Sequence, residues 1–428
     1  MKRRQKDNFS PGFDGEKHIR EAGNCDMMFL RNRKETETMM KKLTALCLLL
    51  ALLLSLTACF AADEVTVPDV QVGTYSIPEN DALKFVRDMK LGWNLGNTFD
   101  AIDCTWLKDP LDYESGWVGV KTSKALIQTL KDAGFKTLRL PVSWHNHVDA
   151  DYQIDAAWLD RVYEVASWAY DLDMYVILNI HHDEAQFLPS PGHYEESARY
   201  IEAIWTQLAE KFRDFDSRLI MESMNEPRLL NSNYEWNFVS AASECRNAAK
   251  CLNQLNQLFV DTVRKSGGNN ADRYLMVPAY AANPDYACDK QFFVLPEDTA
   301  DNRIIVSVHA YTPYSFALQL PGVRTFDIAK QGRDIDNFMD RLYRTYVSMG
   351  TPVVIGEFGA LNKNGNMQDR VDFTAYYVAS ARARGMTTVW WDNHNFTGSG
   401  EQFGLIDRRS CEWKAPKILE AMLKYCGE

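Results

Sequence analysis

Apolar residues along this chain fall into short continuous runs that alternate with longer stretches of helical period. We predict eight strands from these runs: Lys90–Leu95, Thr137–Pro141, Met174–Ile180, the stretch Ile220–Pro227, Arg273–Pro278, Arg303–His309, Pro352–Glu357 and Thr387–Asp392. The runs are apolar throughout rather than at every second position, which indicates strands buried on both faces, as in a parallel sheet.

Helical periods separate these strands at fairly even intervals. We predict helices at Lys121–Ala133, Ser197–Phe212, Ala248–Lys265, Asp336–Met349, Gln368–Arg384 and Trp413–Tyr425. Another helix follows Asp155, whose carboxylate can cap it, and Gly134 suits a left-handed helix end. The helix between the fifth and sixth strands is only weakly indicated.

Eight strand–helix units predict an α/β fold of the (β/α)8 TIM barrel type, with a single catalytic domain. The alternative is a doubly wound open sheet, which requires a glycine-rich phosphate turn after the first strand. The stretch Trp93–Asn97 lacks the G-x-G-x-x-G pattern of that turn, so the barrel is favoured. In a barrel, the active site lies at the carboxyl ends of the strands.

The amino-terminal part of the chain is typical of an export signal. Met39-Met40-Lys41-Lys42 precedes the apolar stretch Leu43–Leu56, which is too short for a transmembrane helix. Leu56-Thr57-Ala58-Cys59 resembles a bacterial lipobox, in which the cysteine is lipidated and becomes the new amino terminus. We interpret residues 1–58 as a leader plus lipoprotein signal peptide, with translation starting at Met39 or Met40. Residues 59–78 then form a tether and residues 79–428 the catalytic domain.

This interpretation predicts a bacterial cell-surface lipoprotein anchored at Cys59, or a secreted protein. The alternative is an ordinary signal peptide in which Cys59 is incidental. Cleavage before Cys59 leaves 370 residues, with 36 Lys and Arg against 51 Asp and Glu and a formal charge of −15. So acidic a chain is a poor partner for nucleic acid or anionic lipid, and the only membrane contact that we expect is the lipid anchor.

Aromatic residues make up 12% of the chain, with 11 tryptophans, and favour a neutral ligand with flat apolar faces. After Cys59 the cysteines are Cys104, Cys245, Cys251, Cys288, Cys411 and Cys426. They can form disulfides in an exported protein, but buried free thiols are an equal alternative. They form no C-x-x-C pair or Cys/His cluster, so we predict no metal site and no cofactor.

Polar and aromatic side chains stand near the carboxyl ends of the predicted strands. In chain order they are Arg139 on the second strand, His181 and His182 after the third, Asn225 and Glu226 after the fourth, His309 and Tyr311 at the sixth, Glu357 on the seventh, and Trp390 and Trp391 on the eighth. Each of these side chains has an alternative structural explanation. Because neighbouring residues of a strand point to opposite faces, one of the two adjacent tryptophans must pack in the core of the barrel. Their convergence on one rim indicates a functional site.

Two glutamates on one rim suit the hydrolysis of glycosidic bonds. One carboxyl group must be protonated to donate to the leaving oxygen, while the other must be ionised to attack or to activate water. A metal-dependent barrel hydrolase needs clustered histidines and carboxylates as ligands, and the first strand offers none.

The ordered set of motifs resembles glycoside hydrolase family 5, and most of all its bacterial endo-β-1,4-glucanases of subfamily 4. The resemblance runs from about Asp81 to the carboxyl end. The motifs that carry it are Gly92–Thr98, Leu138–Trp144, Asn179–Asp183, Met224–Pro227, His309–Tyr311, Ile355–Gly359 and Trp390–Asn393.

The resemblance implies a retaining double displacement in which Glu226 is the acid/base and Glu357 the nucleophile. It further implies that Asn225 binds the 2-hydroxyl of the sugar at the cleavage site. Arg139 and Tyr311 would orient Glu357 and keep it charged, with His309 beside the acid/base. His181, with or without His182, would bind the same sugar, and Trp391, or alternatively Trp390, would form its stacking floor.

Two stretches depart from the subfamily pattern. His394 stands where a glycine is expected after Trp391-Asp392-Asn393, and Tyr113–Gly119 differs from the usual sequence of its loop.

From the resemblance we expect a monomeric endo-β-1,4-glucanase that acts on β-glucan polysaccharides of the cellulose, mixed-linkage or xyloglucan type. The alternatives are a β-mannanase with the same two glutamates and a surface lipoprotein that binds glycans without hydrolysing them.

Overall fold

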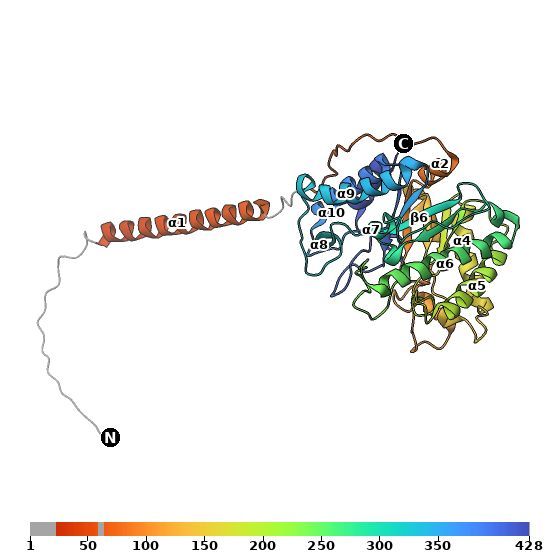
Figure 1. The fold of residues 1–428 in the computed structure, drawn as a ribbon. Coiled ribbons are helices and arrows are strands. Elements are labelled where there is room, and N and C mark those ends of the chain that lie inside the picture. Colours follow the sequence, from red (N-terminus) through yellow and green to blue (C-terminus); the bar gives the residue numbers. More distant parts are fainter. Residues whose placement is uncertain (1–22, 59–63, 428) are drawn as a thin grey trace, which may run out of the picture. The chain divides into compact units, whose positions relative to one another are not determined.

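The computed structural model describes residues 23–58 and 64–427, which belong to two compact units, Met1–Glu64 and Val65–Glu428 (Figure 1). The described part of the first unit is helix α1 (Gly23–Ala58) and Glu64. Within the described ranges, no helix is long and apolar enough to cross a membrane. The predicted lipidation site, Cys59, lies outside the described residues.

The second unit contains a closed barrel of parallel strands paired in chain order, with the last strand beside the first. The strands are β1 (Leu91–Leu95), β2 (Thr137–Leu140), β3 (Tyr175–Asn179), β4 (Leu219–Glu222), β5 (Leu275–Pro278), β6 (Ile304–His309), β7 (Val353–Phe358) and β8 (Thr387–Asp392). All eight predicted strands are present, and the predicted TIM barrel is confirmed. The fourth strand ends at Glu222, so Asn225 and Glu226 lie in the loop that follows it.

Helices surround the barrel (Figure 1). They are α3 (Lys124–Ala133), α4 (Ala156–Asp171), α5 (Tyr194–Lys211), α6 (Ser243–Lys265), α7 (Pro284–Ala287), α8 (Tyr314–Ala317), α9 (Ile328–Thr345), α10 (Met367–Ala383) and α11 (Pro416–Cys426). Asp155 caps α4 by accepting the backbone N–H of Trp158, and Gly134 ends α3 with a left-handed φ of 108°. Between β5 and β6 the chain forms a short 3-10 turn (Tyr280–Ala282) and the single α-helical turn α7, in agreement with the weak pattern there.

Helix α2 (Asp81–Asp88) and the short antiparallel pair β9 (Ile406–Asp407) and β10 (Glu412–Trp413) are absent from the prediction. Asn80 caps α2 by accepting the backbone N–H of Leu83. The helix contributes Ala82 and Val86 to an apolar cluster inside the barrel, so it covers the amino end of the barrel.

The predicted tether is wrong from Val65 onward, because this segment packs against the barrel and belongs to the same compact unit. Its four valines and Ile77 contact the main apolar core. The backbone N–H of Thr66 donates to Gln368 Oε1, and the side-chain amide of Gln368 donates back to Thr66 O. The catalytic unit therefore begins about fourteen residues before the predicted boundary at residue 79.

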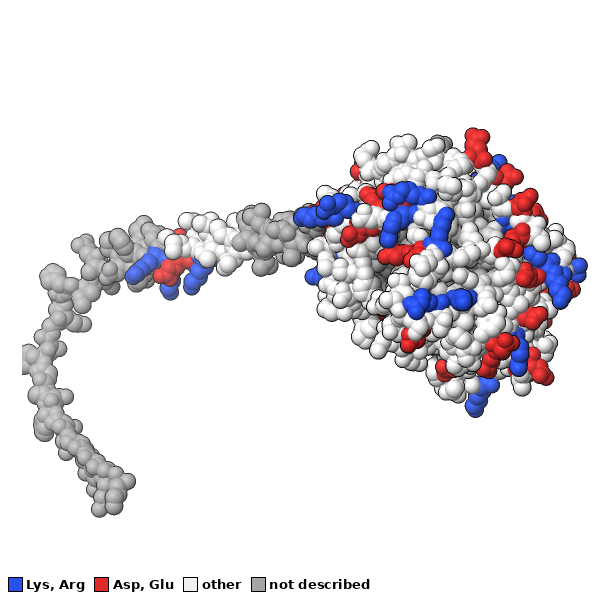
Figure 2. All heavy atoms as spheres, in the orientation of Figure 1, with Lys and Arg blue, Asp and Glu red and all other residues white. Residues whose placement is uncertain are grey.

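Cys47 and the six cysteines from Cys104 onward are free thiols: Cys104, Cys245, Cys251, Cys288, Cys411 and Cys426. For these six, the structure thus selects free thiols over disulfides. On the face of the barrel shown in Figure 2, acidic and basic side chains are interspersed and form no large patch of either sign.

Candidate active site

Arg139 lies at the centre of the carboxyl end of the barrel and is fully buried. Its Nε donates to Glu222 Oε2 and its Nη1 to Glu357 Oε1, each at 2.8 Å. Nη1 also donates to Asn94 Oδ1 at 2.9 Å, and Nη2 donates to Asn225 Oδ1 at 2.8 Å. Because a guanidinium holds its donors in a rigid planar fork, this one side chain fixes the orientation of four others.

Glu222 is, besides Glu357, the other buried carboxylate that pairs with Arg139. Besides Arg139, it accepts a hydrogen bond from Ser307 Oγ at 2.5 Å and one from Asn179 Nδ2 at 3.2 Å. Sequence reasoning missed Glu222, Ser307, Asn179 and Asn94. The sequence signal that could have found them is a polar residue inside an otherwise apolar strand, because a buried polar group requires hydrogen-bond partners.

Glu226 and Glu357 approach each other across this network. Glu226 comes from the loop after β4 and Glu357 from β7, and one carboxylate oxygen of each lies within 4.8 Å of the other. Tyr311 OH donates to Glu357 Oε2 at 2.9 Å. Burial and the charges of Glu357 and Glu226 raise the pKa of Tyr311 well above its ordinary value, so this hydroxyl keeps its proton.

His309 connects Glu226 with Arg139. Its Nδ1 lies 2.7 Å from Glu226 Oε1 and its Nε2 lies 3.3 Å from Arg139 Nη2. When the imidazole is neutral, Nε2 accepts from the guanidinium, which only donates, and the proton on Nδ1 is donated to Glu226. Burial lowers the pKa of His309, but the charge of Glu357 and the hydrogen bond to Glu226 raise it above its ordinary value and favour the charged ring. Gly356 leaves room for this ring, because a Cβ there would lie 3.2 Å from His309 Nε2.

Two opposing effects set the proton affinity of Glu226. Burial alone raises the pKa of this carboxyl group, but the hydrogen bond from His309 and the positive charges of His309 and Arg228 outweigh burial. The pKa of Glu226 therefore lies below its ordinary value in the free protein.

The two histidines after β3 differ in charge, because one is neutral and the other is protonated. Burial lowers the pKa of His181 well below its ordinary value, and the charges of His182 and Arg139 lower it further. For His182, burial is outweighed by the hydrogen bond and charge of Glu184, which raise the pKa to about 9. His181 is thus neutral and His182 charged at pH 7. Asn179 Nδ2 lies 3.1 Å from His181 Nδ1, so that nitrogen accepts and Nε2 carries the proton.

Trp391 and Trp390 face opposite sides of β8. Trp391 lines the cleft and stacks parallel to His181, with ring centres 5.6 Å apart. Trp390 is fully buried, contacts Phe358 edge-on and donates from its indole nitrogen to Phe403 O. The alternative assignment of Trp390 as the stacking floor is therefore wrong, because its ring packs in the core.

An open cleft of about 1130 Å³ crosses this end of the barrel. It brings together the predicted residues His181, His182, Asn225, Glu226, His309, Tyr311, Glu357 and Trp391. Arg139 lies beneath them. The cleft wall also contains Asn97, Trp236, Tyr314, Asn393, Asn395 and Glu401, which sequence reasoning did not select.

Two groups of side chains in the described residues bring possible metal ligands within 4.8 Å of one another: Asp100, His181 and His182, and Glu226, His309 and Glu357. Both oxygens of Asp100 already accept backbone N–H groups, from Asn97 and Thr98. In the second group, the guanidinium of Arg139 occupies the position of a counter-ion to Glu357. In both groups, carboxylate oxygens that could bind a metal are thus already engaged in hydrogen bonds or an ion pair.

Comparison with known proteins places this arrangement in a family. Residues 101–397 match the family model described as cellulase, glycosyl hydrolase family 5. Endoglucanase B of Ruminococcus albus is 42% identical over 347 residues, which cover 80% of each chain. The chain belongs to glycosyl hydrolase family 5.

Solved structures of family 5 members superimpose on the barrel. A lichenase from Caldicellulosiruptor sp. F32 in complex with cellotetraose is 51% identical with a TM-score of 0.84, over 85% of this chain and all of that one. A broad-specificity endoglucanase of subfamily 4 from Ruminococcus champanellensis, with bound cellotriose, is 41% identical with a TM-score of 0.76, over 82% of this chain and all of that one.

The departure from the subfamily pattern at His394 has a visible backbone reason. His394 adopts a left-handed φ of 56°, a conformation that glycine adopts without strain, which explains why a glycine is expected there. Its ring contacts Phe396 and does not line the cleft. In the other divergent stretch, Trp117 is 41% exposed and its ring centre lies 5.9 Å from that of His182.

Proposed function

We propose that the protein is a retaining endo-β-1,4-glucanase that cleaves internal bonds of cellulose-type, mixed-linkage or xyloglucan chains. The observation that carries this proposal is the approach of the Glu226 and Glu357 oxygens to within 4.8 Å in an open cleft. Retaining glycosidases hold their two carboxyl groups about 5 Å apart, whereas inverting enzymes need about 6.5–9.5 Å to admit a water molecule.

Glu357 acts as the nucleophile. The two hydrogen bonds from Arg139 and Tyr311 fix the positions of its oxygens. It attacks the anomeric carbon of the sugar, the bond from that carbon to the leaving oxygen breaks, and a glycosyl ester forms. Asn225, whose Oδ1 accepts from Arg139, is held with its NH₂ group free to donate to the 2-hydroxyl of that sugar.

Glu226 acts as the acid and then as the base. A neutral sugar that displaces water from the cleft strengthens the desolvation of Glu226 and leaves the nearby charges unchanged, so substrate binding raises its proton affinity. The protonated carboxyl group donates to the leaving oxygen. In the second step, Glu226 takes a proton from the water that attacks the glycosyl ester.

The names of the relatives support the substrate class, because they include endoglucanases and a lichenase. A matched panel of mixed-linkage glucan, carboxymethylcellulose, xyloglucan, glucomannan and pure mannan tests it. We expect faster release of reducing ends from the glucans than from mannan. Equal or greater activity on pure mannan would favour the β-mannanase alternative, and glucan binding without hydrolysis would favour the binding lipoprotein.

The stereochemical outcome tests the mechanism. Proton NMR of early products should show the β-anomer before mutarotation. A 2-deoxy-2-fluoro-β-cellobioside with a dinitrophenyl leaving group should label Glu357, identified by peptide mass spectrometry. Initial release of the α-anomer would overturn the retaining mechanism.

We further propose that the chain is exported and anchored by a lipid on Cys59, on the basis of the Leu56–Cys59 motif. Wild-type protein expressed in a bacterial host should partition with the membrane fraction, and Cys59→Ala should release it. Membrane association of Cys59→Ala equal to wild type would refute the anchor.

A further inference from the structure

Arg408 is a buried arginine near the carboxyl end of β8. It directly follows β9, and only 3% of its surface is exposed. Its Nη2 donates to Asp392 Oδ1 at 3.0 Å and to Asp392 O at 2.6 Å. Its Nη1 donates to Gly96 O at 2.9 Å and to Thr98 Oγ1 at 2.6 Å. This one side chain thus joins the carboxyl end of β8 to the turn that follows β1.

Asp392 is the fixed point of the loop that follows β8. The residue is fully buried, and its Oδ1 also accepts the backbone N–H of His394 at 2.9 Å, while its Oδ2 accepts that of Leu405 at 2.7 Å. Its carbonyl oxygen accepts the backbone N–H of Gly96 at 3.1 Å. A buried carboxylate is costly unless it is paired, and Arg408 supplies the charge that pairs it. The ion pair therefore holds both ends of the loop 393–405 in one place.

Trp391 lies against this junction. A Cβ on Gly96 would lie 2.8 Å from Cζ2 and from Cη2 of the Trp391 indole, and 2.8 Å from Asp392 O. The edge of the indole thus contacts the backbone of Gly96, whose carbonyl accepts from Arg408. Trp391 also packs in a small apolar cluster with Phe403, from the loop after β8. Because the backbone and this cluster confine the ring, a shift of the junction would move the indole relative to the nucleophile.

The loop after β8 also carries polar groups to the cleft. Asn393 Nδ2 donates to Glu401 O at 2.9 Å, and Asn393 Oδ1 accepts the backbone N–H groups of Asn395 and Phe403, each at 3.2 Å. Asn393, Asn395 and Glu401 all line the cleft. Since these bonds hold the loop together internally, we expect it to move as one body when the ion pair at its base is lost.

We propose that Arg408 is a positioning residue, which acts with Asp392 to hold Trp391 at the height that the sugar attacked by the nucleophile requires. The inference rests on the proposed function, because it needs a sugar stacked on Trp391 while the glycosyl ester forms. A guanidinium presents its donors in a rigid fork, and here the fork has acceptors on two separate elements, β8 and the turn after β1. A lysine ammonium keeps the charge but cannot hold both elements in one geometry.

A double-mutant cycle tests whether Arg408 acts through Trp391. The substrate is β-cellobiosyl fluoride, whose reactive leaving group keeps weak residual activity measurable. We expect Arg408→Lys to lower kcat/KM about tenfold, mostly in kcat, because a misplaced sugar still binds but is poorly aligned for attack. In the Trp391→Ala background the same substitution should change kcat/KM less than about twofold, because the indole that Arg408 positions is absent. Asp392→Asn should show the same dependence on Trp391.

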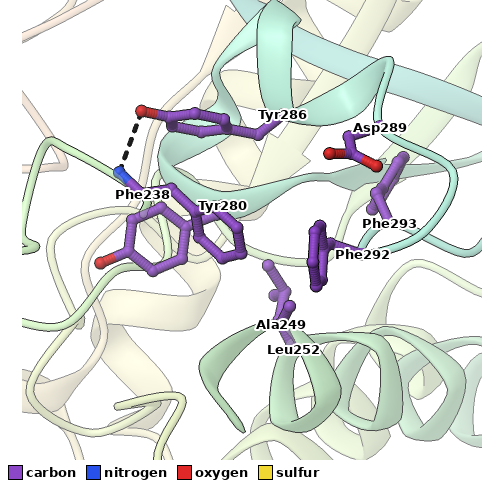
Figure 3. Close-up of a pocket in the computed structure, with 8 residues that line it drawn as sticks. All are labelled: Phe238, Ala249, Leu252, Tyr280, Tyr286, Asp289, Phe292 and Phe293. Carbon is purple, nitrogen blue, oxygen red and sulfur yellow. Dashed lines mark hydrogen bonds between the residues drawn. The ribbon is translucent and has the colours of Figure 1, made fainter. Parts of the chain in front are cut away.

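Two control variants separate positioning from a general loss of stability. Arg273 is also fully buried, but its Nη atoms donate to backbone carbonyls of residues 212–219, at the amino ends of β4 and β5. Arg273→Lys should lower the melting temperature and leave kcat/KM within about twofold of wild type at a temperature where the variant is folded. Tyr286→Phe removes the hydroxyl that accepts the backbone N–H of Phe238 at 2.9 Å, in an aromatic cluster outside the cleft, and should behave likewise (Figure 3).

Equal losses from Arg408→Lys in both backgrounds, or no loss in the presence of Trp391, would overturn the positioning role. Thr98→Val gives a second test if Arg408→Lys does not fold, since it removes a single acceptor of the guanidinium. It should lower kcat/KM about threefold with Trp391 present and not at all in Trp391→Ala. Equal effects of Thr98→Val in the two backgrounds, including none in either, would again overturn the proposal. If wild-type protein hydrolyses neither β-cellobiosyl fluoride nor mixed-linkage glucan, the proposed function fails instead, so the two failures are distinguishable.

Discussion

Two layers of the barrel interior differ completely in chemistry although they belong to the same strands. The lower layer, near α2, is hydrocarbon and includes Ile177, Ile220 and Ile305. Two residues further along the same strands, the upper layer contains Asn179, Glu222 and Ser307, all hydrogen-bonded around Arg139. Successive residues on one face of a strand are about 7 Å apart. The barrel thus separates the part that stabilises the fold from the part that holds the reacting groups.

This separation explains why the upper layer can contain so many charged side chains. Buried ions are costly unless they are paired and hydrogen-bonded, and here Arg139 faces the two carboxylates Glu222 and Glu357. The apolar layer beneath offsets that cost by burying side chains from six strands and α2. Substitutions in the two layers should therefore separate activity from stability.

The largest effect is expected at the reacting carboxylates above the upper layer. Glu357→Ala and Glu226→Ala should each lower glucan hydrolysis by about 10³-fold or more, because each removes a group that acts only in the transition state. The melting temperature should change little in Glu226→Ala, whereas Glu357→Ala also removes one of the two carboxylate partners of Arg139 and should lower the melting temperature. Azide should rescue Glu357→Ala with an α-glycosyl azide product, because azide then attacks the sugar from the side vacated by the nucleophile. In Glu226→Ala, azide attacks the glycosyl ester on Glu357 from the opposite side, so the product should be a β-glycosyl azide. Exchanged product anomers would reverse the two assigned roles.

The next largest effect should come from the charge balance of the upper layer. Glu222→Gln leaves Arg139 with one carboxylate partner and should reduce both kcat and stability, the latter by about 3 kcal/mol. Ser307→Ala removes only one neutral donor to the same carboxylate and should cost about 1 kcal/mol. Chemical denaturation and steady-state kinetics measure both. If Glu222→Gln retained full activity and stability, the carboxylate would not be needed to hold Arg139.

The lower layer should respond in the opposite way. Ile220→Ala creates a cavity beneath Glu222 and should cost about 2–4 kcal/mol in the free energy of unfolding. Because the hydrogen bonds of the upper layer remain, kcat/KM should stay within about threefold of wild type at a temperature where the variant is folded. Ile220→Val is the matched control and should cost about 1 kcal/mol. A tenfold loss of kcat/KM in folded Ile220→Ala would show that the layers are coupled.

The sequence carries enough information to predict the lower layer and the order of the strands. Continuous apolar runs such as Met174–Ile180 specify burial on both faces, and their number and spacing specify the barrel. Helix α2 escaped prediction because it is only eight residues long, and its apolar positions Leu83 and Val86 make a single contact stripe. The segment from Val65 was mistaken for a tether because its valines pack without regular secondary structure.

For the site, strand order predicts which side chains share a rim but not which of them touch. Glu226 and Glu357 were predictable because each ends an apolar run. Glu222 was hidden inside the run that leads to Glu226, and its role depends on Arg139, 83 residues away in the chain. Arg228 and Trp236 lie in a loop without periodicity, so only the fold shows that their side chains stack.

The smallest effect should appear on the cleft wall, outside both interior layers. His182 has a pKa of about 9 and Glu184 one of about 2, so their pairing stabilises the fold between these values. The His182 contribution is complete below its unfolded pKa of about 6.5 and is lost as pH rises through 9, whereas the Glu184 contribution is lost as pH falls below about 4. With His182 31% exposed, solvent screening reduces the effect to about 1 kcal/mol.

His182→Asn should therefore lower the free energy of unfolding by about 1 kcal/mol at pH 6 and by much less at pH 10. Urea denaturation at both pH values measures the difference, and Ile220→Val, in the apolar lower layer, is expected to cost the same at both. A pH-independent difference for His182→Asn would mean that its ring contributes by packing against Trp117 and His181 rather than by charge. In that case the wall of the cleft would resemble the apolar lower layer more than the charged upper one.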